Sequence, residues 1–229
     1  MKRNCLVLLI VSLLILSGCA QLPAGAPTPS PGSPVGDVKI LTRSGYLTAG
    51  FPGHYLEIYG ELQNTGNKNL RFIKLTTTLY DSAGNVIGTK WTYAHTDILL
   101  PGEKAPFVFM KMISQEKDYK SYGLEVTSCR ETTEEPYRNF EFLDTSSYID
   151  DKGYYRVKGE LKNTGTQDID FVGVIITCYN AEGKVISASG TCLMVDLKAG
   201  KTAPFDTEAH PKQISSQIRN YSLQTDVSD

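Results

Sequence analysis

The chain has 229 residues, of which 41% are hydrophobic and 21% are charged, and its formal net charge is −2 at neutral pH. This composition is typical of a globular protein and excludes a disordered chain. The slightly negative charge gives no indication of a basic surface for nucleic acid. Thirteen Tyr, twenty Gly and eleven Pro favour strands and turns over helices.

The N-terminus has the pattern of a secretory signal. Two basic residues precede an apolar run over residues 5–16, which is short for a membrane span of about 20 residues. Residues 16–19 read LSGC and resemble the prokaryotic lipoprotein signal. That resemblance implies removal of the signal peptide 1–18 and lipidation of Cys19. The mature protein would then be anchored in the cell membrane through this lipid, on the extracytoplasmic side. Secretion without a lipid is the alternative.

Residues 19–36 are predicted to be an extended linker. They contain five prolines and almost no large apolar side chains, so they lack the means to form a core and favour the polyproline II conformation. Such a linker would hold the folded part of the chain away from the membrane.

The remainder of the chain contains one unit twice, at an offset of 99 residues. The sequence GELQNTG at 60–66 recurs as GELKNTG at 159–165, and LYDSAGNVI at 79–87 recurs as CYNAEGKVI at 178–186. This period is too long for a solenoid repeat. It indicates two tandem domains, at 37–130 and 137–229, joined by a polar linker at 131–136.

Apolar residues alternate with polar ones inside each unit. In the first unit Leu56, Ile58 and Leu62 are predicted to face a core, and the residues between them to face outward. Residues 81–84 and 180–183 end in Gly and are predicted to be hairpin loops. Short strands separated by turns indicate an all-β fold with one β-sandwich in each unit.

The repeated residues resemble those of the FxLYD domain of prokaryotic envelope proteins. The matching positions include Phe72 and the turn sequence 79–81, although Thr77 and Ile176 occupy the Phe position for which that domain is named. The resemblance implies two immunoglobulin-like β-sandwiches displayed at the cell surface. It implies no catalytic residues, because the shared positions belong to strands and turns.

Two pairs of polar residues occupy equivalent positions in the units. Glu61 and Glu160 are predicted to be solvated residues on the outward side of a strand, which argues against a catalytic carboxylate pair. Asn64 and Asn163 precede Thr-Gly at a strand end, where an Asn side chain bonds to the turn backbone.

The histidines and methionines of the chain do not have the sequence spacing of a metal site. His54, His95 and His210 are isolated in the sequence, without metal-ligand spacing. Met110 and Met112 place two thioethers on one side of a predicted strand, and thioethers bind Cu(I). We interpret the two methionines as core residues. No metal, cofactor or catalytic residue is predicted.

Besides Cys19, three cysteines follow the signal peptide, and their pairing is left open. Cys178 occupies the position of a buried Leu and is interpreted as a small core residue. Its predicted hairpin partner lies near residue 186, which places Cys192 too far along the strand for a simple bridge. No specific disulfide is predicted among Cys178, Cys192 and Cys129. The sequence NYS at Asn220 fits an N-glycosylation acceptor.

These observations favour a membrane-anchored, non-catalytic binding, adhesion or scaffold module of the cell envelope. A small solute- or metal-capturing lipoprotein is the alternative. The units differ outside their shared positions, since Trp91 corresponds to Gly190. We therefore expect recognition to belong to one unit. Tyr55 and Tyr59 are the candidate face for an envelope protein or a glycan, unless they pack beneath a neighbouring part of the chain.

Overall fold

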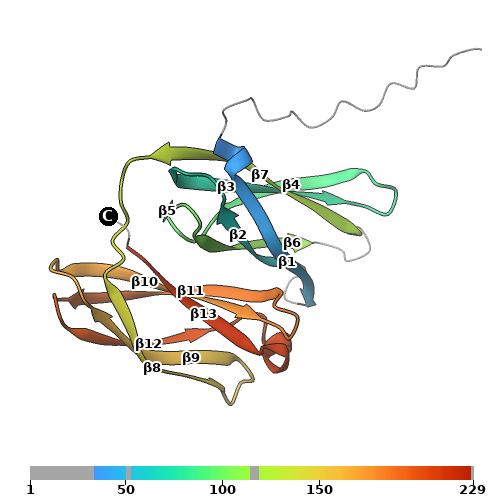
Figure 1. Ribbon diagram of the computed structural model, residues 1–229. Coiled ribbons are helices and arrows are strands. Elements are labelled where there is room, and N and C mark those ends of the chain that lie inside the picture. Colours follow the sequence, from blue (N-terminus) through green and yellow to red (C-terminus); the bar gives the residue numbers. More distant parts are fainter. Residues whose placement is uncertain (1–33, 50–52, 114–118, 228–229) are drawn as a thin grey trace, which may run out of the picture. The chain divides into compact units, whose positions relative to one another are not determined.

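The computed structural model describes residues 34–49, 53–113 and 119–227. The predicted signal peptide, Cys19 and most of the predicted linker lie outside the described residues. Residues Gly32–Asp229 form one compact unit. The described part is built mainly of antiparallel strands, and its helices are two short 3₁₀ helices, η1 at Pro34–Asp37 and η3 at Lys212–Gln217 (Figure 1). The predicted all-β fold is confirmed.

The first half forms a sandwich of two sheets, which we call the first sandwich. One sheet has the strand order β1-β2-β6. The other has the order β4-β3-β5, and β7 also pairs with β3. The strands are β1 (Val38–Ala49), β2 (His54–Asn64), β3 (Asn69–Tyr80), β4 (Val86–Tyr93), β5 (Ile98–Leu99), β6 (Lys104–Ile113) and β7 (Ser121–Thr132).

The second half repeats this arrangement and is called the second sandwich. Its sheets have the orders β12-β9-β8 and β11-β10-β13. In the first sandwich, two strands, β4 and β5, pair with successive parts of β3. In the second sandwich, the single long strand β11 pairs with the equivalent length of β10. The strands are β8 (Phe140–Ile149), β9 (Tyr155–Asn163), β10 (Ile169–Tyr179), β11 (Val185–Leu197), β12 (Thr202–Glu208) and β13 (Asn220–Asp226).

The two predicted hairpin loops are confirmed and have the same geometry. Gly84 and Gly183 adopt φ values of 83° and 73°, a left-handed conformation that glycine accepts without steric cost. The Oδ1 atoms of Asp81 and Asn180 each accept two backbone N–H bonds within their own loop. The repeat in the sequence therefore specifies the same turn twice.

Each sandwich has its own core. The first core includes Leu75 and Phe107, and the second includes Val174 and Leu161. Residues 133–139 lie between β7 and β8, at the place of the predicted linker. The independent folding of segments 37–130 and 137–229 stays a prediction.

Strands β2 and β9 occupy equivalent positions but are buried differently. In β9, exposed residues alternate with buried ones toward the end of the strand. In β2 the prediction of an outward polar side is wrong, because Glu57, Tyr59 and Glu61 are only 9%, 1% and 5% exposed. Tyr59 packs in a small cluster with Val185 and Ala188 of the second sandwich. The second sandwich therefore covers the outer side of β2.

Candidate functional site

Tyr59 is not available as the predicted partner face. Its ring is buried, and its hydroxyl donates a hydrogen bond to Oε2 of Glu57 at 3.0 Å. Burial, together with the nearby Glu57 carboxylate, raises the pKa of Tyr59 far above its ordinary value. Tyr55 is half-buried on the same strand. The prediction of exposure is thus wrong for Tyr59, and packing within the chain, the alternative considered above, is what the structure shows.

Glu61 also differs from its prediction, whereas Glu160 agrees with it. The hydroxyl of Tyr179 in the second sandwich donates to Oε1 of Glu61 at 2.6 Å, and Nζ of Lys104 lies 3.3 Å from Oε2. Glu160 is exposed, as predicted. The two carboxylates share a repeat position but do not share a site.

Asn64 and Asn163 have the structural role that was predicted. Nδ2 of Asn64 donates to the carbonyl oxygens of Lys68 at 2.7 Å and Leu99 at 3.0 Å, and its Oδ1 accepts the N–H of Gly66 at 3.0 Å. Both side chains are fully buried. The equivalent bonds of Asn163 involve Gln167, Leu197 and Gly165.

The methionines of β6 are not core residues. Met110 and Met112 are 45% and 47% exposed, so that interpretation is wrong. In the register of β2 and β6, Met110 lies opposite Glu57 and Met112 lies opposite Tyr55. Both thioethers are therefore accessible on the surface of the first sandwich.

The three histidines lie on different elements. His54 begins β2, His95 follows β4, and His210 follows β12, where its Nε2 lies 3.0 Å from Oε1 of Glu208. Burial lowers the pKa of His95. Within residues 34–49, 53–113 and 119–227, no group of three His, Cys, Asp or Glu side chains is placed to hold a metal ion. The described helices are too short to cross a membrane.

Two of the cysteines have thiols that the structure describes, and both are free. Burial raises the pKa of Cys178 to about 12 and, together with nearby acidic residues, that of Cys129 to about 11. Cys178 lies opposite Ser187 in the hairpin, next to the predicted partner, whereas Cys192 lies opposite Gly173. Cys178 is therefore the buried small residue that was predicted.

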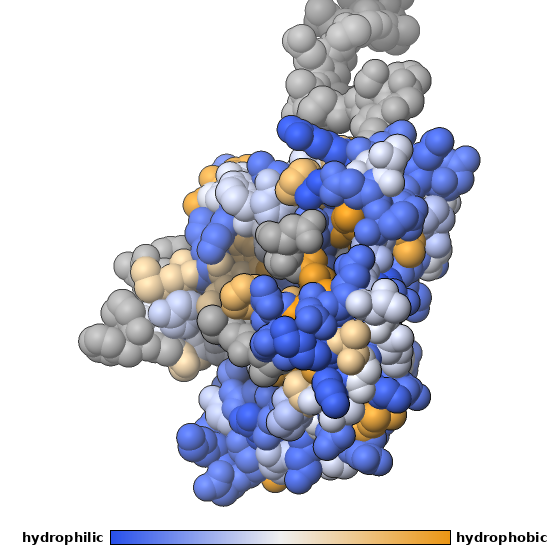
Figure 2. Space-filling model, turned by 90° about the vertical axis from the view of Figure 1, so that its left-hand side faces the viewer, coloured by the Kyte–Doolittle hydropathy of each residue, from blue (hydrophilic) through white to orange (hydrophobic). Residues whose placement is uncertain are grey.

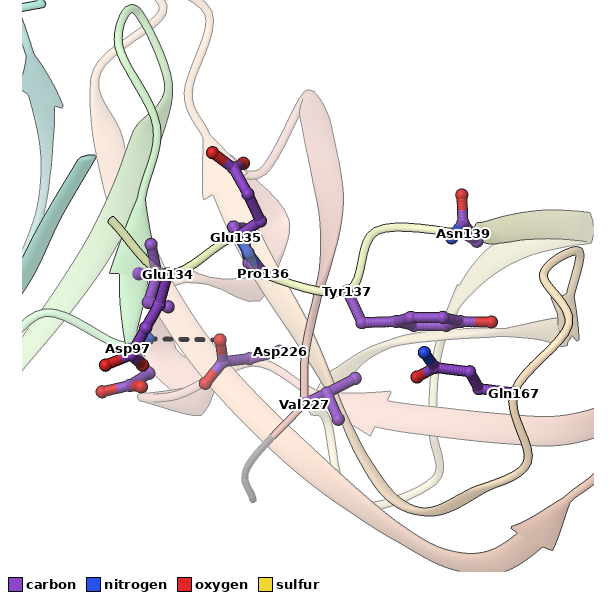
Figure 3. A pocket seen from close by; sticks show the side chains of 10 residues that line it. Asp97, Glu134, Glu135, Pro136, Tyr137, Asn139, Gln167, Asp226 and Val227 are labelled. Carbon is purple, nitrogen blue, oxygen red and sulfur yellow. Dashed lines mark hydrogen bonds between the residues drawn. The ribbon is translucent and has the colours of Figure 1, made fainter. Parts of the chain in front are cut away.

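A pocket of about 500 Å³ lies where the two sandwiches and the linker meet (Figure 3). Asp97 donates its backbone N–H to Oδ1 of Asp226 at 3.2 Å, and Arg71 forms ion pairs with Asp97 and Glu134. Burial raises the pKa of Asp226. Tyr137 lies at the other end of the pocket (Figure 3). The polar groups that line the pocket bond to one another across the contact between the two sandwiches. We therefore interpret this pocket as part of the interface between the sandwiches.

The outer side of the β3-β4-β7 sheet carries a cluster that sequence reasoning missed. Phe72, Trp91 and Tyr93 are 43%, 53% and 44% exposed, and we call these three residues the aromatic face. The rings of Trp91 and Tyr93 meet edge to face, with centroids 5.3 Å apart. Trp91 and Tyr93 lie opposite Thr76 and Lys74 of β3.

Figure 2 shows one side of the molecule. On that side of the molecule hydrophilic residues cover most of the surface, and hydrophobic residues are exposed in small separate patches. Isolated apolar residues are normal on a protein surface, whereas a cluster of large ones indicates a binding site. The aromatic face is therefore the candidate site.

The backbone at Phe72 supports this assignment. Phe72 has a φ of 52°, a left-handed conformation that is rare for a bulky residue and costs about 1–3 kcal/mol. The pairing of β3 with β7 is interrupted between Arg71 and Lys74. Strain of this kind persists where the surrounding structure holds a residue for a function.

The second sandwich lacks the equivalent cluster. Phe171 corresponds to Phe72 and is 48% exposed, but Gly190 takes the place of Trp91 and Gly173 that of Lys74. The substitution of Trp91 by Gly190 between the units was the sequence signal for this site. What the sequence did not reveal is that Phe72 and Tyr93 are exposed beside it.

No protein-family model matches the chain, and no curated protein matches it. Solved structures that match parts of the chain include a β-glucuronidase and an exo-chitosanase. A calcium-binding mutant of β-glucuronidase 2 from Bacteroides uniformis is 14% identical over 72% of this chain and 23% of its own, with a TM-score of 0.25. The exo-chitosanase of Amycolatopsis orientalis is 12% identical over 80% of this chain and 26% of its own, with a TM-score of 0.23. This chain thus spans about a quarter of their length.

Proposed function

We propose that the protein is a lipid-anchored envelope protein whose first sandwich binds a partner through the aromatic face, without a catalytic role. The observation that carries the proposal is the exposure of three aromatic side chains on one side of one sheet. Large aromatic residues are enriched at binding surfaces because they supply contact area at low cost in conformational entropy.

The arrangement of the two sandwiches supports the choice of face. The outer side of the β1-β2-β6 sheet is partly covered by the second sandwich through Tyr59 and Glu61. The β3-β4-β7 side carries the aromatic face. A partner of the first sandwich would therefore approach the side opposite to the tandem contact.

The anchor is tested by Cys19→Ser in the full chain. If the lipoprotein signal at residues 16–19 is used, the variant is released into the medium or stays an unprocessed precursor, because the acyl chains are lost. A mature variant that remains in the membrane would contradict lipid anchoring.

The binding face is tested by photo-crosslinking on whole cells. A benzophenone side chain in place of Tyr93 inserts into C–H bonds of proteins and glycans alike. We expect adducts from this position that diminish when Trp91→Ala is added. The matched control places the same group at Tyr148 of the second sandwich, which is 37% exposed. Absence of adducts at position 93, or equal adducts at both positions, would contradict the proposal.

One observation favours capture of a soft metal ion as a second candidate function. Met110 and Met112 expose two thioethers on one side of β6, and thioethers select Cu(I). In that case Cu(I) raises the midpoint of thermal unfolding, and Met110→Leu with Met112→Leu abolishes the increase. An unchanged midpoint would remove this candidate.

A further inference from the structure

Positive charge is concentrated at the aromatic face. Nζ of Lys74 lies 4.9 Å from the ring centroid of Trp91. The guanidinium carbons of Arg71 and Arg130 lie 4.4 Å and 5.8 Å from the ring centroid of Phe72. Three cations thus lie within contact distance of two exposed rings, which is the geometry of a cation–π interaction.

Among the described residues, two of these cations form no ion pair with an acidic side chain. Arg71 forms ion pairs with Asp97 and Glu134. In the ion pairs of the residues that the structure describes, neither Lys74 nor Arg130 takes part. Because the chain as a whole is slightly negative, this pair of unneutralised cations is a local feature suited to an anionic ligand.

The space beside the rings has room for a small polar ligand. A pocket of about 390 Å³ is lined by Phe72, Tyr93, Ser128, Cys129 and Arg130. Ligand sites of proteins have volumes of about 300–1,000 Å³ and combine apolar walls with a few polar groups. The residues that line this open pocket thus offer two aromatic rings, two hydroxyls, a thiol and one cation.

Hydroxyl groups continue along the same side of the sheet. The Oγ1 atoms of Thr76 and Thr127 are 2.9 Å apart and exposed, and Thr76 lies between Trp91 of β4 and the exposed Glu125 of β7. A row of hydroxyls next to aromatic rings is complementary to a sugar, which has an apolar C–H side and a rim of hydroxyls. A large protein partner would instead require an extended apolar centre.

We infer that the aromatic face binds an acidic polysaccharide built of uronic acids, an inference that rests on the proposed function and specifies its ligand. A sugar ring lies against Tyr93 or Trp91 through its C–H side. Its carboxylate pairs with the guanidinium of Arg130 or the ammonium of Lys74, and Arg and carboxylate form strong charge-assisted bonds.

The second sandwich serves as an internal comparison. Asp170 and Gly173 replace Arg71 and Lys74, and Gly190 replaces Trp91. Its exposed Phe171 therefore lacks these cations and the second aromatic side chain. We assign binding of the polysaccharide to the first sandwich alone.

The single tryptophan of the chain makes the test direct. Because Trp91 is the only Trp, a change in tryptophan fluorescence reports this face. The full chain is titrated with polygalacturonate and with alginate, two polyuronates that are built of different uronic acids. Fully methyl-esterified polygalacturonate keeps the sugar and removes the charge, and polyglutamate keeps the charge and removes the sugar.

We expect both polyuronates to change the Trp91 emission, with an affinity that falls as salt is added. Lys74→Ala with Arg130→Ala should weaken binding roughly tenfold or more, since the charge-assisted bonds to the carboxylates are lost. The control is Lys158→Ala, which removes a cation 5.3 Å from the Tyr148 ring in the second sandwich and should leave the affinity unchanged. Unchanged unfolding midpoints establish that both variants are folded.

Several results would overturn the inference. An equal response to the esterified polymer would indicate a neutral glycan, and an equal response to polyglutamate would indicate an acidic peptide. No response to either polyuronate would exclude this ligand class. If crosslinked adducts at position 93 persist in that case, the proposed function holds and only the acidic polysaccharide is excluded.

Discussion

The same repeat position has opposite surroundings in the two sandwiches. Tyr59 of β2 is 1% exposed and lies against Val185 and Ala188, whereas its counterpart in β9, Lys158, is exposed. Glu61 accepts a hydrogen bond from Tyr179 of the second sandwich, whereas Glu160 is exposed. The difference arises because the hairpin of β10 and β11 packs against the β1-β2-β6 sheet of the first sandwich. Within the described residues, no equivalent hairpin packs against the β12-β9-β8 sheet of the second sandwich.

The uncovered side of the second sandwich is adapted to water. Arg156 forms ion pairs with Asp150, Asp206 and Glu208 on this side, and the hydroxyl of Tyr148 donates to Asp206. Terminal units of repeat proteins have such polar outer faces, which keep them soluble. The contact between the sandwiches, rather than the repeat itself, thus decides which side of each unit is available for binding.

Truncation at the covered position should have the largest effect. Tyr59→Ala removes a buried ring between the sandwiches and should lower the free energy of unfolding by about 3–5 kcal/mol. Lys158→Ala at the equivalent exposed position should change it by less than about 0.5 kcal/mol. Urea unfolding measures both values. Equal effects would show that the second sandwich does not cover β2.

Truncation of Asn64 and Asn163 should have similar effects in the two sandwiches, because both side chains make equivalent bonds to the turn backbone. Asn64→Ala and Asn163→Ala each remove the hydrogen bonds to two carbonyl oxygens and one N–H, and Asn163→Ala also removes the bond that the Tyr137 hydroxyl donates to Oδ1 at 2.7 Å. Each change should lower the free energy of unfolding by about 2–3 kcal/mol. Thermal and urea unfolding of the two variants provide the comparison. A large effect in one sandwich only would contradict the equivalence of these turns.

A smaller and pH-dependent difference is expected at Cys178, whose counterpart is Leu79. Burial raises the pKa of the folded thiol to about 12 from 9.0, so the unfolded chain loses its proton first. This contribution to stability is complete below about pH 9 and is lost as the pH rises toward 12, by at most about 1.4 kcal/mol per pH unit.

The measurement compares Cys178→Val with the parent chain. Between about pH 8 and 10.5 the parent should lose about 1–2 kcal/mol more in its free energy of unfolding than the variant, whose side chain does not ionise. Tyr59, whose pKa is also raised without a contribution from Cys178, acts equally in both proteins. Identical slopes against pH would contradict the burial of the Cys178 thiol.

Local patterns predicted the strands, the turns and their repetition. The alternation at Leu56 and Ile58 gives the buried side of β2, and the loops ending in Gly84 and Gly183 give the hairpins, because these features depend on neighbours in the chain. The contact between the sandwiches depends on residues 118 positions apart in the bond of Tyr179 to Glu61, so alternation alone did not reveal it. The same limit applies to Met110, which is exposed although it lies in a hydrophobic strand.

The candidate site was only partly predictable for the same reason. The contrast between Trp91 and Gly190 pointed to the first unit. The exposure of Phe72 depends on a left-handed φ of 52° and an interrupted pairing with β7, and neither has a glycine or turn signal in the sequence. Tyr55 and Tyr59 were proposed instead because outward alternation was assumed to mean exposure.

The most direct test of the account is a double-mutant cycle across the two sandwiches. Glu61→Ala and Tyr179→Phe are measured singly and together by urea unfolding, and the same is done for the equivalent residues Glu160 and Tyr80. If the second sandwich covers β2, the free energies of unfolding of the first pair are coupled by about 1 kcal/mol. Either single change already removes the hydroxyl–carboxylate bond of 2.6 Å, so the second change does not remove it again. The equivalent pair should be additive within about 0.5 kcal/mol. Additivity of Glu61 and Tyr179 would contradict the contact and, with it, the choice of the free side for binding.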